Sequence, residues 1–193
     1  RVFYQNVGQP RLTGVSELKT LLTETNRARN SVKNNTDILI DPAKPYRTFA
    51  VAEINNSTYI YDMNTNTKIR DRNGNKLNNF ADDLPPKKDR FFVDYEEIAV
   101  EGFNQTHAEI KILEEIARQN CDNEVVGTAN YTNKSGTFKE FNIYRCSPII
   151  VDYFTDRATC PVCSSAIRNF IKKATSGVNE QGKGITLNAK NFD

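Results

Sequence analysis

The sequence is poor in the residues that build metal sites and disulfide frameworks. It has one histidine, His107, and four cysteines among 193 residues. Four cysteines, of which only two form a Cys-x-x-Cys, are too few and too unevenly spaced for a disulfide scaffold. We expect Cys121 and Cys146 to be buried thiols, with a disulfide between them as the alternative. A metal site that combines nitrogen and sulfur ligands must use His107.

Long apolar runs are also missing. No segment approaches the about 20 apolar residues that a membrane-spanning helix needs, and the N-terminus lacks the charged-then-apolar pattern of a signal segment. Methionine occurs once, at Met63, and the chain begins at Arg1. We therefore expect the chain to be cut from, or encoded within, a longer polypeptide.

An excess of charge of one sign is absent, since 26 Lys and Arg stand against 24 Asp and Glu and the net charge is +2. This balance excludes a strongly basic protein that wraps nucleic acid, but it permits a local basic groove. The segment 68–90 is rich in both lysine or arginine and aspartate. Such a run is usually a solvated loop, and binding of nucleic-acid phosphates is the alternative.

The hydrophobic pattern predicts an α/β fold with an N-terminal accessory helix. Residues 1–14 are expected to be an extended lead-in or linker, and helical spacing runs from Ser16 to about Asn35. We divide the chain into a lead-in and accessory helix (1–46) and a main domain (47–193). Alternating strands and helices in the second half favour a layered α/β sheet.

Two hairpins and two further strands are predicted in the main domain. Asn55 and Asn56 tolerate the positive φ of a tight turn, which makes the first hairpin the clearest. Residues 64–90 are expected to be mostly irregular, and 94–100 to form a short helix or turn. The predicted strands are 48–54, 58–62, 124–131, 138–144, 148–154 and 184–187, and the predicted helices are 107–119 and 161–173.

Two short motifs stand at the starts of the two predicted helices of the main domain. Thr106-His107-Ala108-Glu109 fits a capping box, with Thr106 as N-cap and Glu109 three residues later. Side chains in the first turn of a helix also project past its end, so His107 and Glu109 can instead face a metal and its bound water.

The second motif is Cys160-Pro161-Val162-Cys163. Alone it is compatible with a redox pair, half of a structural zinc knuckle or two core thiols. Pro161 fits the first position of a helix. Cys121 or Cys146 could complete a closed structural site as a fourth ligand.

Together the motifs are more specific than either alone. His107, Cys160 and Cys163 supply three ligands and leave the fourth position of a tetrahedral zinc open for water. Zinc brings the pKa of such a water toward about 7. These are the groups that deamination of a nucleobase requires. Glu109, which is not a ligand, would take the proton of the water and return it to the ring nitrogen of the base and to the leaving ammonia.

These residues resemble the cytidine-deaminase-like superfamily, with His-Ala-Glu on one helix and Pro-Cys-x-x-Cys opening the next. Within it, 106–117 and 153–171 look like the deaminase domains of bacterial polymorphic toxins. The resemblance covers about 47–188, and it implies the order strand, strand, helix, strand, helix, strand around a central mixed sheet flanked by helices. Thr159 departs from the family, which often has proline there; we expect metal binding to be retained because Pro161 still favours the helix start.

The resemblance implies a zinc-dependent hydrolase that converts cytosine to uracil in nucleic acid, with DNA favoured over RNA. It implies the toxin domain of a larger effector, secreted by its producer for interbacterial competition and active in the cytoplasm of the target cell. An immunity protein would cover the active site, and no membrane partner is expected. Phe49, Tyr153 and Phe154 are candidates for stacking on a base, although strand aromatics are more often core residues.

Two other functions stay open. One is a deaminase of free nucleosides or of tRNA adenosine, against which the extra helix and hairpin argue. The other is a non-catalytic binding module that zinc stabilises.

Overall fold

In the computed structural model of the chain, the described residues are 2–7, 15–38, 48–65, 68–86, 89–91, 107–132, 138–156, 163, 167, 170 and 185–192. Within them no helix combines the length and the apolar character needed to cross a membrane. The predicted helix or turn at 94–100 lies outside the described residues.

Strands and helices follow one another in the order that the sequence predicts for the main domain, with one addition at the N-terminus. The elements are β1 (Val2–Val7), α1 (Val15–Asn35), β2 (Phe49–Ile54), β3 (Thr58–Met63), α2 (Ala108–Asn120), β4 (Cys121–Thr132), β5 (Phe138–Cys146), β6 (Ile150–Thr155) and β7 (Thr186–Phe192). Between β6 and β7, Cys163, Ile167 and Phe170 are helical and fully buried. Their spacing of four and three residues places them on one helix face, as expected for the predicted helix 161–173.

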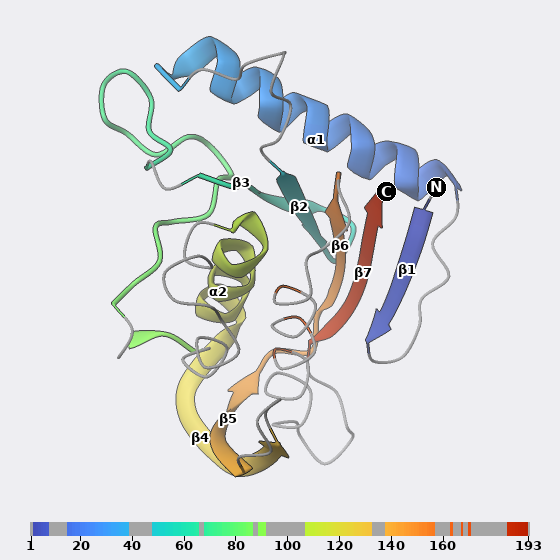
Figure 1. Cartoon of the computed structure of the whole chain (residues 1–193), viewed down its shortest axis with the longest axis vertical. Coiled ribbons are helices and arrows are strands. Elements are labelled where there is room, and N and C mark those ends of the chain that lie inside the picture. The colour runs from blue at the N-terminus through green and yellow to red at the C-terminus, as the bar shows by residue number, and fades with distance from the viewer. Residues whose placement is uncertain are drawn as a thin grey trace.

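The strands form a mixed five-stranded sheet and a separate two-stranded ribbon (Figure 1). The sheet has the order β1-β7-β6-β2-β3, in which β6 and β7 are parallel and the other neighbours are antiparallel. The ribbon consists of β4 and β5. The chain therefore belongs to the α/β class, and the prediction of a central mixed sheet is confirmed.

The sheet lies between helices because β2, one of its inner strands, is apolar on both faces. Ala50, Ala52 and Ile54 of β2 pack in one cluster with the apolar residues of α2. Phe49 and Val51 point the other way and pack with the apolar residues of α1. Since successive side chains of a strand point to opposite faces, α1 and α2 cover opposite faces of the sheet.

The turn between β2 and β3 has the conformation that the sequence predicts. Asn55 and Asn56 have φ of 50° and 59°, and the Ser57 N–H donates to the Ile54 carbonyl over 3.1 Å. Two successive residues with positive φ give the turn a twist that matches the twist of the flanking strands. This hairpin is confirmed.

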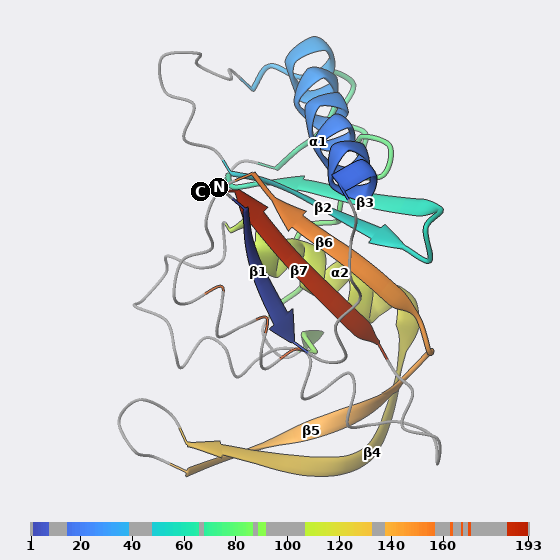
Figure 2. The same ribbon diagram turned by 90° about the vertical axis from the view of Figure 1, so that its right-hand side faces the viewer.

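The N-terminus and the C-terminus form two neighbouring strands, which the sequence analysis did not expect. Residues 1–14 were predicted as a lead-in or linker, but Val2–Val7 pairs antiparallel with β7. The last strand was predicted to end at Leu187, but it continues to Phe192. Both termini consequently lie at the same edge of the sheet (Figure 2).

The ribbon β4–β5 lies away from the five-stranded sheet (Figure 2) and is closed at its base by a disulfide between Cys121 and Cys146. The expectation that these two cysteines are thiols is therefore wrong, and its alternative is correct. The cause is the strand register, which places the two residues directly opposite each other. The disulfide also removes both sulfurs from the candidate fourth ligands of a closed zinc site.

Removing this disulfide should lower the free energy of unfolding by about 3 kcal/mol, since it closes a loop with a sequence separation of 25 residues. We expect the double substitution Cys121→Ser and Cys146→Ser to show this loss in urea unfolding at neutral pH. Wild-type protein reduced with dithiothreitol is the control and should unfold at the same urea concentration as the double variant. Equal stability of oxidised and reduced wild type would contradict the prediction.

Candidate metal centre

Helix α2 is buried along most of its length, including four of its charged residues. Residues 108–117 are all buried, and four of them are charged: Glu109, Lys111, Glu114 and Glu115. Burial of a charge is unfavourable unless hydrogen bonds or an opposite charge compensate it. The partners of these four side chains therefore show what holds α2 in place.

The helix begins one residue later than a Thr106-based capping box requires. Its N-cap residue is His107, which has extended backbone angles and makes no side-chain capping hydrogen bond. The predicted capping arrangement is thus wrong for this helix start, and Thr106 itself lies outside the described residues. As a consequence, the side chains of His107 and Glu109 are directed to other contacts at the helix end.

His107 and Glu109 meet Cys163 at the start of α2. The Nδ1 atom of His107 lies 2.9 Å from the Sγ atom of Cys163, although the two residues are 56 positions apart in the chain. One side-chain ligand atom from each of the three residues lies within 4.8 Å of the others. All three are buried, with 7%, 4% and 0% of their surface exposed. The predicted site residues Cys163, His107 and Glu109 are therefore brought together.

The chemistry of these groups fits a zinc ion. An imidazole nitrogen and a cysteine sulfur are among the ligands that zinc prefers, and three groups this close can face one ion. A carboxylate next to two such ligands is also suited to receive a proton from a water molecule. Cys160, the third predicted ligand, lies outside the described residues and stays a prediction.

Lys111 fixes the first turn of α2 to the end of β3, a contact that the sequence analysis missed. Its Nζ atom lies 3.0 Å from Oδ1 of Asp62, and it donates to the carbonyl oxygens of Met63 (2.9 Å) and Thr65 (3.4 Å). Lys111 is one helical turn beyond His107 and bonds to the His107 carbonyl through its backbone N–H (3.3 Å). The available signal was a lysine placed directly between two apolar residues, Ile110 and Ile112.

Asp62 has an unusual protonation equilibrium. Burial raises the pKa of its carboxyl group from 3.8 to about 6, against the opposing effect of the Lys111 ammonium and the Met63 N–H. The burial effect is the larger one because the side chain is almost fully removed from water.

The three candidate stacking residues are separated by the sheet. Phe49 and Phe154 are fully buried in the cluster beneath α1, on the face opposite α2. Tyr153 is fully buried in the cluster on the α2 side. Phe49 and Phe154 are therefore core residues that a base at the His107 end of α2 does not reach, because both faces of the sheet are covered.

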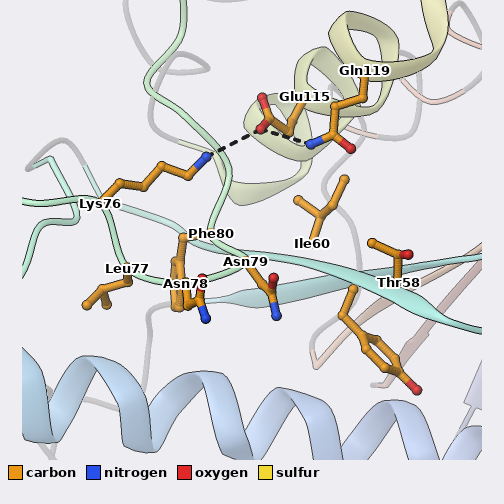
Figure 3. A pocket seen from close by; sticks show the side chains of 10 residues that line it. Thr58, Ile60, Lys76, Leu77, Asn78, Asn79, Phe80, Glu115 and Gln119 are labelled. Carbon is orange, nitrogen blue, oxygen red and sulfur yellow. Dashed lines mark hydrogen bonds and ion pairs between the residues drawn. The ribbon is translucent and has the colours of Figure 1, made fainter.

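A cavity of about 330 Å³ lies beside the other end of α2 (Figure 3). Lys76, Asn79, Thr58, Glu115 and Gln119 are among its lining residues. Glu115 lies two helical turns from Glu109, and neither His107 nor Cys163 lines the cavity. The cavity is thus separate from the candidate metal centre.

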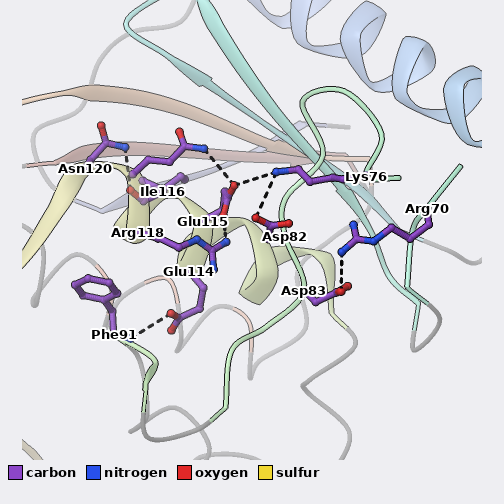
Figure 4. Close-up of polar contacts among 11 residues, drawn as sticks. Arg70, Lys76, Asp82, Asp83, Phe91, Glu114, Glu115, Ile116, Arg118 and Asn120 are labelled. Atoms are coloured by element: carbon purple, nitrogen blue, oxygen red, sulfur yellow. Dashed lines mark hydrogen bonds and ion pairs between the residues drawn. The ribbon is translucent and has the colours of Figure 1, made fainter. Parts of the chain in front are cut away.

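Two basic residues of the segment 68–90, Arg70 and Lys76, have acidic partners in the fold (Figure 4). Arg70 donates to Asp83 over 2.9 Å, and Lys76 lies 3.6 Å from Asp82 and from Glu115. Glu115 also pairs with Arg118. These pairs favour the solvated-loop interpretation of this segment over a phosphate-binding one.

Comparison with protein-family models, with curated proteins and with solved structures finds no match to the chain. The candidate metal centre therefore has to be judged on its own geometry.

The purified protein should contain about one zinc per chain. His107→Ala and Cys163→Ala should each remove most of this zinc, as measured by elemental analysis after dialysis. The double substitution Cys121→Ser and Cys146→Ser is the matched control and should keep the metal, because those sulfurs form the disulfide. Wild-type protein without zinc after purification in zinc-supplemented medium would contradict the assignment.

Asp62 should make the stability of the fold depend on pH. Because its pKa is raised in the folded state, that state binds more protons than the unfolded state between pH 3.8 and about 6. Stability therefore falls as pH rises through this window, by roughly 3 kcal/mol from this group. Urea unfolding of wild type and Asp62→Asn from pH 4 to pH 7 should show this fall in the free energy of unfolding only in the wild type. If the free energies of unfolding of the two proteins change in parallel with pH, the prediction is contradicted.

Proposed function

We propose that the chain is a zinc-dependent hydrolytic deaminase that converts cytosine to uracil in nucleic acid, with DNA favoured over RNA. The observation that carries the proposal is the convergence of His107, Glu109 and Cys163 in a buried position at the start of α2. These are the residue types that a base deaminase needs, in the roles that their chemistry allows.

His107, Cys163 and Cys160 would hold the metal. When bound, zinc supplies a hydroxide nucleophile near neutral pH, because it lowers the pKa of a bound water. Glu109 would take one proton of the water and give it to the ring nitrogen next to the reacting carbon. It would then take the second proton, from the hydroxyl added to that carbon, and give it to the amino group, which leaves as ammonia. Water and cytosine are consumed, and uracil and ammonia are formed.

Burial of the site sets a condition on the substrate. The three residues expose between 0% and 7% of their surface. A base within a stacked duplex cannot reach such a position, so the target cytosine has to be single-stranded or flipped out of the helix. Burial also strengthens the interaction of the Glu109 carboxylate with developing charge, since the local dielectric constant is low.

The resemblance to polymorphic-toxin deaminases supports a role for this activity in competition between bacteria. The chain would act in the cytoplasm of a target cell after secretion as part of a larger effector, and an immunity protein would protect the producer. The Cys121–Cys146 disulfide supports passage through an oxidising compartment, because such bonds are rare in proteins that stay in a reducing cytosol.

Glu109→Ala should abolish mutation of nucleic acid and leave zinc binding and the fold intact. In bacteria that lack uracil-DNA glycosylase, expression of the wild type should raise C-to-T changes in DNA. Loss of the proton carrier should lower the rate of deamination by a factor of at least about 10². Glu115→Gln is the matched control, because Glu115 is a buried glutamate of the same helix whose partners are Lys76, Arg118 and Gln119.

Three other results would redirect the proposal. Changes in RNA but not in DNA would reassign the substrate. Ammonia release from free cytidine, without changes in nucleic acid, would indicate a metabolic deaminase. Full activity of Glu109→Ala, together with unfolding of Cys163→Ala, would indicate a binding module that zinc stabilises.

A further inference from the structure

The end of β6 is held by three contacts of Asp156, the residue that follows this strand, with two partners. Its Oδ1 atom accepts a hydrogen bond from the Phe49 N–H over 3.1 Å, and its own N–H donates to the Phe49 carbonyl over 3.2 Å. Its Oδ2 atom pairs with the guanidinium of Arg29 on α1. Cys163 follows only seven positions later in the chain.

Arg29 contacts the neighbouring strand as well. Its guanidinium lies over the ring of Phe49, 4.4 Å from the centroid, and Phe49 is fully buried. The side chains of Arg29 and Asp156 expose 27% and 12% of their surface. A partly buried guanidinium that both pairs with a carboxylate and stacks on a ring is more strongly fixed than an exposed ion pair.

These contacts lie at the same end of the sheet as the candidate metal centre. Phe49 is the register partner of Met63, and Thr155 is the register partner of Ala50. The Met63 carbonyl accepts the hydrogen bond of Lys111, which anchors the first turn of α2. Contacts thus run from α1 on one face, through the ends of β6, β2 and β3, to the helix that carries His107 and Glu109 on the other face.

We infer that Arg29 is a positioning residue for the metal centre: through Asp156 it fixes the point from which the chain leaves the sheet toward Cys163. The inference rests on the proposed function, because it concerns the same site. It makes α1 a required part of that site rather than an accessory to it. Lys111 sets the position of the helix that carries His107, and Arg29 sets the departure point of the segment that carries the cysteine.

Zinc affinity tests this inference without any measurement of activity. In the full chain, Arg29→Ala should weaken zinc binding about 10-fold in competition with a chromophoric chelator, as for other residues that orient ligands without touching the metal. The thiolate-to-metal absorption of the cobalt-substituted protein should change as well. Arg27→Ala is the matched control, because Arg27 lies on the same helix but pairs with Glu24 and has a side chain that is 69% exposed. It should bind zinc as the wild type does.

Asp156→Asn keeps an oxygen that can accept the Phe49 N–H and removes only the charge, so it decides the matter if Arg29→Ala does not fold. It should weaken zinc binding to the same extent, and the double variant should be no weaker than either single variant. Wild-type affinity and an unchanged cobalt spectrum in folded Arg29→Ala or Asp156→Asn would overturn the inference and leave the proposed function standing, even if the melting temperature falls. A wild type that binds no zinc would overturn both.

Discussion

The buried ion pair between Lys111 and Asp62 is the contact on which the arrangement of the candidate site depends. An ammonium group inside a protein needs acceptors from several directions, and Lys111 finds them in Asp62 and in the carbonyls of Met63 and Thr65. These acceptors all belong to the end of β3 and the residues just after it. A shift of α2 by one turn, about 5.4 Å, would leave the charge without them. This pair therefore helps to fix where His107 and Glu109 lie along the sheet.

The site also depends on the way in which the two faces of the sheet are joined. Apolar residues of β2 alternate between the α1 side and the α2 side, so each helix packs on its own cluster and has little contact with the other. Polar contacts at the strand ends connect the layers, through Asp156 and Phe49 on one side and Met63 on the other. A metal centre at this end of the sheet would therefore depend on both helices, although its described residues come from one face.

Local chemistry explains which parts of the structure were predictable. The turn at Asn55 and Asn56 follows from two residues that tolerate positive φ, and the convergence of His107 with Cys163 follows from two short motifs. Features that depend on strand register were not predictable in this way. The disulfide requires Cys121 and Cys146 to be opposite each other across a ribbon, and β1 requires a partner from the far end of the chain. The burial of Phe49 and Phe154 beneath α1 could not be predicted either. The alternation of side chains along a strand does not show which helix covers which face when both faces are apolar.

The charged residues of α2 separate structural from chemical roles. Lys111 is compensated by Asp62, Glu114 accepts the Phe91 N–H, and Glu115 pairs with Arg118. Each of these contacts joins α2 to another segment or lies within the helix, and each is explained by the stability of the fold. Glu109 differs in its surroundings, because the groups within 4.8 Å of its carboxylate include an imidazole nitrogen and a thiol sulfur. A carboxylate whose only role was to stabilise the helix start could do so equally well at the protein surface. There it would keep its hydration, and no free energy of desolvation would oppose its charged form. Its burial beside two metal-binding groups supports the role in proton transfer that we propose for it.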